Sequence, residues 1–416
     1  MTSSACPRCF TRLEADPATR CYLCLNPSCL IRPDPTDPEK RRGVDVIATA
    51  YYGPFVPERP LLEKVPDTAK EAAEGKLCPE CKKANYLKEA CPRCHCPFPL
   101  ADWRQRSVTT VAMAGAKTSG KSVYLAVMVE ELKKHVKRFW RNTVLAVDDA
   151  DPGLGKQKTE ERYETYYRQR LYVARGMPEG TKDEDPFQRD PLIYELGTFN
   201  GQNSVLVLRD VAGEALEKVP TDPPPDHWTF LKRADGVLFL YDIENDEHIR
   251  EYLENNTDFD LLPRSALGRE PSHVLNQVLK LIGEERPRFG LILSKFDYVQ
   301  ALPDLPVDDL ITKSLRNKGA AFNREPEISG DPDDFLLLHQ ELTSLLDLFD
   351  ASSLIYAIQN QRSDTADHFA LFAVSSLGEP VIGKQVSSRG ITPFRILDPI
   401  LWLLSYRWNM RGEGLS

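Results

Sequence analysis

The stretch GAKTSGKS, Gly115 to Ser122, decides the fold of this chain. It fits the pattern G-x-x-x-x-G-K-[ST], in which glycines let backbone N–H groups surround a phosphate. Val108 to Ala114 before it reads as a buried strand, and Val123 to Phe139 after it reads as a helix. A strand, a glycine loop and a helix in this order predict a P-loop that binds nucleotide phosphates.

The positions of this loop have separate expected roles. Lys121 is expected to reach the β- and γ-phosphates, and the Ser122 hydroxyl to bind Mg²⁺ at the helix N-terminus. The residues expected to contact nucleotide here are Gly115, Ala116, Lys117, Thr118, Ser119, Gly120, Lys121, Ser122 and Val123. The alternative is a plain glycine turn, which the strand, the Lys-Ser pair and the helix in register argue against.

Composition sets limits on the class of protein. With 416 residues, of which 41% are apolar and 28% charged, the chain can form two or three ordinary globular domains. A net charge of −9 argues against general binding to nucleic acid or anionic membrane, and leaves a local basic patch open. No apolar run approaches the length of a membrane span, and MTSSACPRCF lacks a signal-peptide core. We therefore expect a cytoplasmic protein.

All ten cysteines lie between Cys6 and Cys96. Because a reducing cytosol disfavours disulfides, paired C-x₂-C knuckles about ten residues apart predict closed Zn²⁺ sites with four thiolates. One site is expected from Cys6 and Cys9 with ligands chosen among Cys21, Cys24 and Cys29, where Cys21 and Cys29 compete for a place. The other is expected from Cys78, Cys81, Cys91 and Cys94, which leaves Cys96 spare.

These sites suggest a domain order. Residues 1–32 are expected to form a first zinc ribbon, 33–76 a Pro-rich linker and 77–100 a second ribbon. Within the linker, Val44 to Val56 is predicted to form a strand or hairpin. The P-loop domain then spans 106–411, with helical insertions at about 155–176 and 314–362.

The rest of the chain predicts a doubly wound α/β sheet. Further strands are expected at Thr143 to Val147, Leu192 to Leu196, Ser204 to Leu208, Val237 to Tyr241, Phe289 to Leu293 and Ala370 to Val374. The second and third of these form a hairpin around Asn200-Gly201. The second insertion holds two expected helices, Asp333 to Phe349 and Ser352 to Gln361, and Ile396 to Met410 is expected to cover one face of the sheet.

Two strand ends carry motifs for metal and base. In the segment DVAG, Asp210 is expected to hold Mg²⁺ through water, and the Gly213 amide to sense the γ-phosphate. In the segment SKFD, Asp297 can accept both donor groups on the edge of guanine, while the Lys295 stem lies along the base. Ser294 completes this motif. Ser375, Ser376 and Leu377 follow the last strand and are expected to finish the base pocket.

With these motifs in this order, the chain resembles the Ras-like GTPases of the translation-factor-related class. GAKTSGKS resembles their first motif, DVAG the third, SKFD the fourth with Ser for the usual Asn, and SSL the fifth, over about residues 107–410. The resemblance implies a Ras-like P-loop GTPase sheet that binds GTP or GDP. The cysteine knuckles and the ending TPFRILDPILWLL are similar to the double-GTPase families of bacterial conflict systems. That implies a regulatory switch that binds partner proteins through switch loops, ribbons or insertions.

The catalytic motifs depart from the pattern. Thr181 is the best candidate for the second motif, a threonine that closes on Mg²⁺. Glu214 stands where many relatives of this class place a water-orienting Gln. Arg175 is an arginine that can act in cis; the alternatives are that it only complements the dipole of its helix and that a partner supplies the arginine. With Lys121 these two residues form the expected catalytic set of a GTP-hydrolysing enzyme. The alternatives are an ATP-dependent enzyme, which SKFD argues against, and a nucleotide-binding pseudo-GTPase scaffold.

Overall fold

The computed structural model describes most of the chain. Described are residues 4–407 except 15, 17, 18, 30–42, 53–55, 63–77, 79, 84, 85, 149–157, 178–189, 200, 219–223, 305–307, 362–367, 382–385 and 388.

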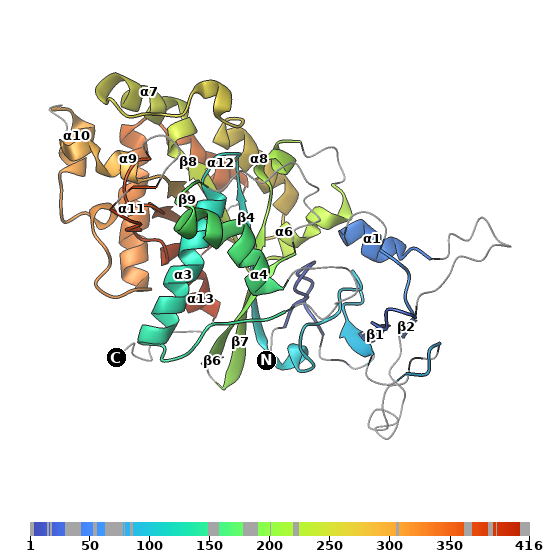
Figure 1. Ribbon diagram of the computed structural model, residues 1–416. Helices are drawn as coiled ribbons and strands as arrows, with labels where there is room; N and C mark the ends of the chain where they lie inside the picture. The colour runs from blue at the N-terminus through green and yellow to red at the C-terminus, as the bar shows by residue number, and fades with distance from the viewer. Residues whose placement is uncertain are drawn as a thin grey trace.

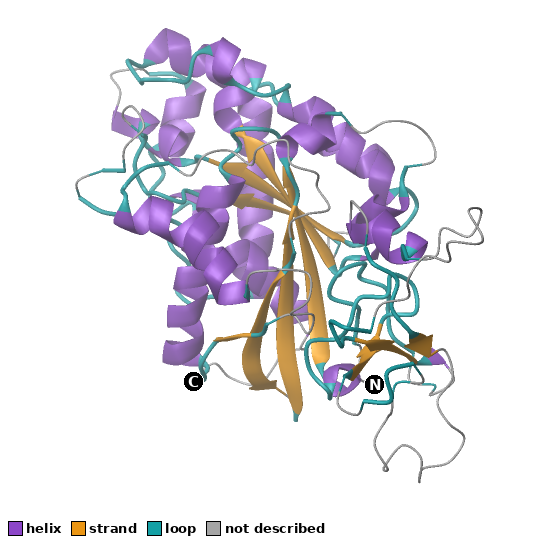
Figure 2. Cartoon of the chain, turned by 45° about the vertical axis from the view of Figure 1, so that its right-hand side comes forward, coloured by secondary structure: helices purple, strands orange, loops and turns teal. Residues whose placement is uncertain are grey.

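A seven-stranded mixed sheet forms the centre of the molecule (Figures 1 and 2). Its strands are β4 (Ser107–Gly115), β5 (Leu145–Ala146), β6 (Leu192–Phe199), β7 (Gln202–Asp210), β8 (Gly236–Asp242), β9 (Arg288–Ser294) and β10 (Phe369–Ala373). They lie in the order β10-β9-β8-β4-β7-β6-β5. The first five strands are parallel, β6 is antiparallel to β7, and β5 is antiparallel to β6. Every residue of β4, β8, β9 and β10 is buried, as expected for parallel strands covered on both faces.

The strands lie where the sequence predicts them, and β6 and β7 form the expected hairpin with Leu192 opposite Leu208. Helices pack around the sheet (Figure 2). They are α3 (Lys121–Phe139), α5 (Gly213–Glu217), α6 (Thr229–Arg233), α7 (Glu247–Asn256), α8 (Pro271–Ile282), α9 (Asp297–Gln300), α10 (Leu310–Leu315), α11 (Pro332–Leu348), α12 (Ser353–Gln361) and α13 (Asp398–Arg407). Short 3₁₀ turns occupy Trp103–Gln105, Asp226–Trp228, Ile243–Asn245, Arg264–Ala266, Leu302–Asp304 and Ala321–Asn323. The α/β expectation is thus confirmed at this level.

Two segments differ from the local predictions. The expected helix at 155–176 is an α-helical turn, α4 (Thr159–Tyr163), that continues as a π-helix, Glu164–Val173. The expected strand or hairpin at 44–56 contains a helix, α1 (Val46–Tyr52). Asp45 begins this helix because its carboxylate accepts a hydrogen bond from the Ala48 backbone N–H at 2.8 Å. This capping signal outweighs the β-branched residues that suggested a strand.

The N-terminal region has one small sheet that joins both expected ribbons. It consists of β1 (Cys21–Cys24), β2 (Leu61–Leu62) and β3 (Leu87–Ala90), in the order β2-β1-β3 and all antiparallel. Since β1 comes from the first expected ribbon and β3 from the second, the two ribbons are not separate successive units.

Part of this region shares the core of the large sheet. Phe10, Phe98 and Trp103 are at most 2% exposed and belong to the same apolar cluster as β4 and α3. The Trp103 indole N–H donates to the Ala5 carbonyl at 2.9 Å, and the Ser4 hydroxyl donates to the Trp103 carbonyl at 2.8 Å. The N-terminal knuckle is therefore built onto the P-loop domain. No helix among the described residues is long and apolar enough to cross a membrane.

Candidate nucleotide site and cysteine clusters

The P-loop lies between the end of β4 and the start of α3, at the centre of the sheet. Gly115 has φ 149°, and a Cβ there would lie 2.6 Å from the Leu240 carbonyl oxygen on the neighbouring strand. Gly120 has φ 81° and directly precedes α3. Only glycine fits both requirements, for close approach and for positive φ. Strands β5 to β7 lie on one side of β4 and β8 to β10 on the other, so the strand order reverses at β4. Such a topological switch point is where α/β sheets bind ligands.

Charged side chains of the loop are held by nearby groups. The Lys121 ammonium donates to the Gly115 and Ala116 carbonyls at 2.7 and 2.8 Å and is 7% exposed. Lys117 forms an ion pair with Glu214 at 2.6 Å. At the start of α5, a Cβ on Gly213 would lie 2.5 Å from the backbone nitrogen of Lys117. Helix α5 therefore lies directly on the P-loop, and Glu214 contacts the loop itself.

The acid of the DVAG segment that is predicted to bind metal, Asp210, lies beside the P-loop strand. Asp210 pairs in register with Met113, and the next backbone N–H, that of Val211, donates to the Met113 carbonyl at 3.1 Å. The Asp210 carboxylate also accepts a hydrogen bond from the Tyr167 hydroxyl at 3.4 Å. The π-helix of the first insertion therefore contacts the predicted Mg²⁺ site.

The SKFD segment forms a buried polar cluster. The Asp297 carboxylate is 7% exposed and accepts a hydrogen bond from the Ser375 hydroxyl at 2.8 Å. The Lys295 ammonium contacts Asp242 at 2.9 Å and Glu244 at 2.6 Å, while its backbone adopts φ 57°. This conformation costs a lysine on the order of 1 kcal/mol, which the two ion pairs help to offset.

Burial and charge act in opposite directions in this cluster. Burial raises the pKa of Asp297, although the Ser375 hydrogen bond favours its ionised form. Burial alone would lower the pKa of Lys295, but attraction to Asp242 and Glu244 outweighs it and raises that pKa. Sequence reasoning missed Asp242 and Glu244. The signal was present, because Asp242 ends the apolar strand GVLFLYD just as Asp210 ends β7.

The second predicted base-pocket segment, Ser375 to Leu377, is paired with residues near the C-terminal helix. Ser375 and Phe394 exchange backbone hydrogen bonds at 3.2 and 2.8 Å. The Ser375 hydroxyl also accepts from the Gly378 N–H at 2.8 Å. Ser376 and Leu377 are half-buried. The structure thus joins Ser375 to Asp297 by a direct hydrogen bond, with Ser376 and Leu377 next to it in the chain.

Other predicted residues stand apart. Thr181 lies outside the described residues. Arg175 is exposed with φ 50°, and its carbonyl accepts from the Val386 N–H at 3.1 Å. In the described part of the chain, no hydrogen bond or ion pair joins the Arg175 side chain to the P-loop. Ser122 is half-buried in the first turn of α3, and Val123 is 7% exposed.

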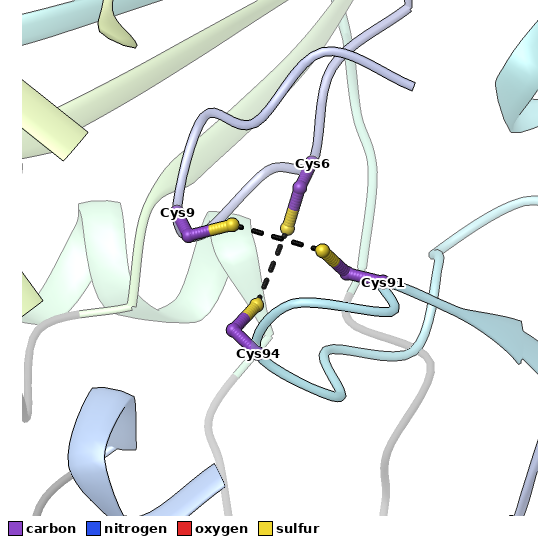
Figure 3. Close-up of side chains that lie close together, drawn as sticks. All are labelled: Cys6, Cys9, Cys91 and Cys94. Atoms are coloured by element: carbon purple, nitrogen blue, oxygen red, sulfur yellow. Dashed lines mark hydrogen bonds between the residues drawn. The ribbon is translucent and has the colours of Figure 1, made fainter. Parts of the chain in front are cut away.

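The first cysteine cluster consists of Cys6, Cys9, Cys91 and Cys94, whose sulfur atoms point toward one another (Figure 3). Their Sγ atoms lie 3.5 Å apart for Cys6 and Cys94 and 3.7 Å apart for Cys9 and Cys91. A tetrahedral zinc site with Zn–S bonds of about 2.3 Å requires sulfur separations of about 3.8 Å. The buried four-sulfur set therefore fits Zn²⁺. We call it the inner cluster.

The second group is Cys24, Cys29, Cys78 and Cys81, which we call the outer cluster. Its Sγ atoms lie 3.9 Å apart for Cys24 and Cys81 and 3.6 Å apart for Cys29 and Cys78. These distances fit the same tetrahedral geometry.

The expected ligand grouping is wrong, because each cluster takes one pair from each end of the N-terminal region. The antiparallel pairing of β1 with β3 sets Cys21 opposite Ala90 and Cys24 opposite Leu87, and so nests the pairs. Cys21 belongs to neither cluster. Its thiol donates to the Ala90 carbonyl at 3.1 Å, and burial raises its pKa to about 12. Cys96 is also outside both clusters, as expected.

Comparisons with known proteins give one full-length relative. The chain is 34% identical over 418 residues to the "Putative ESX-1 scaffolding and assembly protein SaeC" of Mycolicibacterium smegmatis, covering 97% of this chain and 98% of that protein. No family model matches. Among solved structures, the chain is similar to the Saccharomyces cerevisiae Ski7 GTPase-like domain bound to GTP. That match has 12% identity, a TM-score of 0.29 and coverage of 73% of this chain and 50% of the other.

The relative corrects one expectation. Its name describes a scaffolding and assembly protein and not an enzyme. The expectation of a GTP-hydrolysing enzyme is therefore wrong, and we assign no catalytic role to Lys121, Glu214 or Arg175. The comparisons do not connect the chain to the double-GTPase conflict families.

Proposed function

The chain belongs to the family of the scaffolding and assembly protein SaeC, and from this premise we propose that it is a guanine-nucleotide-binding scaffold. In this role a Ras-like P-loop domain holds the nucleotide, and the surfaces around it assemble partner proteins of an ESX-1-type secretion system. We place it in the cytoplasm, where cysteine thiols stay reduced and available for zinc.

The buried Asp297 carboxylate carries the nucleotide part of the proposal. Guanine presents two N–H donors on the edge that a carboxylate can accept, whereas adenine presents an acceptor and a C–H there. Asp297 is held by the Ser375 hydroxyl and begins α9, just after the end of β9. Strand β9 is two strands away from the P-loop strand β4. ATP would leave this buried carboxylate without its partner, at a cost of about 1–3 kcal/mol or more.

The phosphates of the nucleotide would bind at the P-loop, at the opposite end of the site from Asp297. The P-loop amides and the Lys121 ammonium would bind them, and Ser122 and Asp210 would hold Mg²⁺, for which the third predicted ligand is Thr181. Lys121 would exchange its contacts with the loop carbonyls for the phosphates. The ion pair between Glu214 and Lys117 would then respond to bound phosphate, because α5 already contacts the loop.

A cavity of about 530 Å³ supports the scaffold part of the proposal. It is lined by five permanent cations and two carboxylates: Arg12, Lys232, Arg233, Arg286, Arg288, Asp235 and Glu285. Asp235 is already bound by Arg12 and by the Thr110 N–H and hydroxyl, the latter at 2.8 and 2.9 Å. In a chain with net charge −9, this excess of cations, with Phe10 and Leu403 as apolar walls, fits an acidic segment of a partner protein.

The experiment is assembly in cells. A tagged chain is produced in an ESX-1-carrying mycobacterium that lacks its own SaeC, and the ESX-1 components that co-purify with it are quantified. Lys232→Glu with Arg233→Glu should lower their recovery at least severalfold, since like charges would face the acidic partner. The matched control is Lys313→Glu with Arg316→Glu, at an exposed position in α10 and at its C-cap.

An equal loss with the control pair, or full recovery with the cavity pair, contradicts the proposed partner surface. Asp297→Ala in the same assay tests whether the nucleotide takes part. If this variant supports assembly as well as the parent does, the scaffold works without guanine nucleotide.

A further inference from the structure

Arg209 connects the inner cluster to the predicted Mg²⁺ acid. It is the residue before Asp210 at the end of β7 and is 2% exposed. Its guanidinium donates to the Arg8 carbonyl at 2.6 Å and lies 3.7 Å from the centre of the Phe230 ring. Arg8 stands between the inner ligands Cys6 and Cys9. A single side chain therefore connects the Cys6–Cys9 knuckle of the inner cluster to the end of β7, where Asp210 lies.

A second set of contacts fixes the same knuckle to the sheet. Arg8 forms an ion pair with Asp190, and both side chains are buried. Asp190 lies just before β6, the hairpin partner of β7. On the cluster side, the Arg8 N–H donates to the Cys6 sulfur at 3.4 Å, and Phe10 packs edge-on against Phe230 at 5.6 Å. The knuckle backbone is thus held between sulfur atoms and sheet.

The buried charges around the inner cluster explain why Arg209 and the metal depend on each other. Two buried arginines lie close together here, because Arg8 and Arg209 are each 2% exposed and the Arg209 guanidinium binds the Arg8 carbonyl. Arg8 is already paired with Asp190, and a zinc ion with four thiolates has a net charge of −2, which balances the buried charge of Arg209. Removing the ion removes both that charge balance and the fixed shape of the knuckle that presents the Arg8 carbonyl.

We propose that the inner metal is a structural part of the nucleotide site, and that Arg8 and Arg209 are the positioning residues through which it holds β7 and Asp210 against the P-loop. This inference rests on the nucleotide binding proposed above. The outer cluster has its own small apolar group, formed with Leu87 and separate from the main core. It is therefore the internal control: its metal should leave the nucleotide site unchanged.

Three variants of the full chain test the proposal. Cys91→Ser with Cys94→Ser removes the inner site, Cys78→Ser with Cys81→Ser removes the outer site, and Arg209→Met removes the connecting charge but keeps both sites. Zinc content, affinity for a fluorescent GDP analogue and amide hydrogen exchange in β4 and β7 are measured on each. The inner-site and Arg209→Met variants should bind GDP about tenfold or more weakly and exchange faster in β7.

The outer-site variant should lose one zinc ion and keep GDP affinity within about twofold. Unchanged GDP affinity and unchanged exchange in Arg209→Met overturn the proposal; this variant decides the matter if the inner-site variant does not fold. If the parent binds no GDP, the nucleotide proposal fails separately. Exchange in β7 still decides whether the inner metal holds this strand, and equal exchange in all variants would refute it.

Discussion

Arg395 shows how a single buried residue can hold three elements together. It is 1% exposed, has φ 48°, and forms ion pairs with Asp334 of α11 at 2.7 Å and Asp398 of α13 at 2.5 Å. Its Nε also donates to the Ala321 and Arg324 carbonyls at 3.0 and 2.9 Å. These contacts anchor the second insertion to the helix that covers the sheet.

Replacing this arginine should therefore be costly. Arg395→Ala removes this donor from the buried Asp398 carboxylate and from two carbonyls, while Asp334 keeps its ion pair with Arg324. We therefore expect a loss of about 3–5 kcal/mol in the free energy of unfolding. Burial already raises the pKa of Asp398 to about 7 with the arginine present. Chemical denaturation measures the change, and Arg389→Ala, at an exposed pair with Glu379, should change it by less than about 0.5 kcal/mol. Equal stability of the two variants would refute this role.

At the scale of elements, helix α3 carries a titratable group in its buried face. His135 is 6% exposed and packs against Phe139 and Trp140 at ring distances of 4.8 and 5.2 Å. Burial lowers its pKa from 6.5 to about 4. Between these values the unfolded chain binds a proton that the folded chain does not, so stability is present above pH 6.5 and falls as the pH drops toward 4.

This gives a pH prediction. On lowering the pH from 7 to 5, His135→Gln should lose less in melting temperature than the parent, because the proton uptake of the unfolded state is removed. His248→Gln, at an exposed position on α7, should follow the parent. Identical pH profiles for all three proteins would show that His135 does not contribute.

The elements also show what sequence could and could not predict. Strands such as β8 and β9 are apolar runs, so periodicity located them, and the P-loop pattern located the site at the end of β4. The ligand grouping failed because C-x₂-C spacing fixes the knuckles but not which knuckles meet, and that depends on the long-range pairing of β1 with β3. Asp242 and Glu244 were missed because their partner, Lys295, follows a different strand, β9, and local sequence does not show which strands are neighbours.

At the scale of the whole molecule, the chain joins an N-terminal region with two cysteine clusters to an α/β domain through one core. We expect two zinc ions per chain by elemental analysis, one for each cluster. Because the inner cluster shares the core of the large sheet, chelation should lower the main thermal transition and not only unfold the N-terminal region. One ion per chain, or an unchanged main transition after complete chelation, would contradict this arrangement.

The proposed scaffold requires a guanine nucleotide in the P-loop domain. Calorimetric titration of the zinc-loaded chain with GDP and with ADP, in the presence of Mg²⁺, tests this most directly. We predict one GDP per chain and an affinity at least about tenfold higher than for ADP, with the preference lost in Asp297→Ala, because only guanine pairs with this buried carboxylate. Equal affinities for GDP and ADP, no binding of either, or a GDP preference that survives Asp297→Ala would contradict the account.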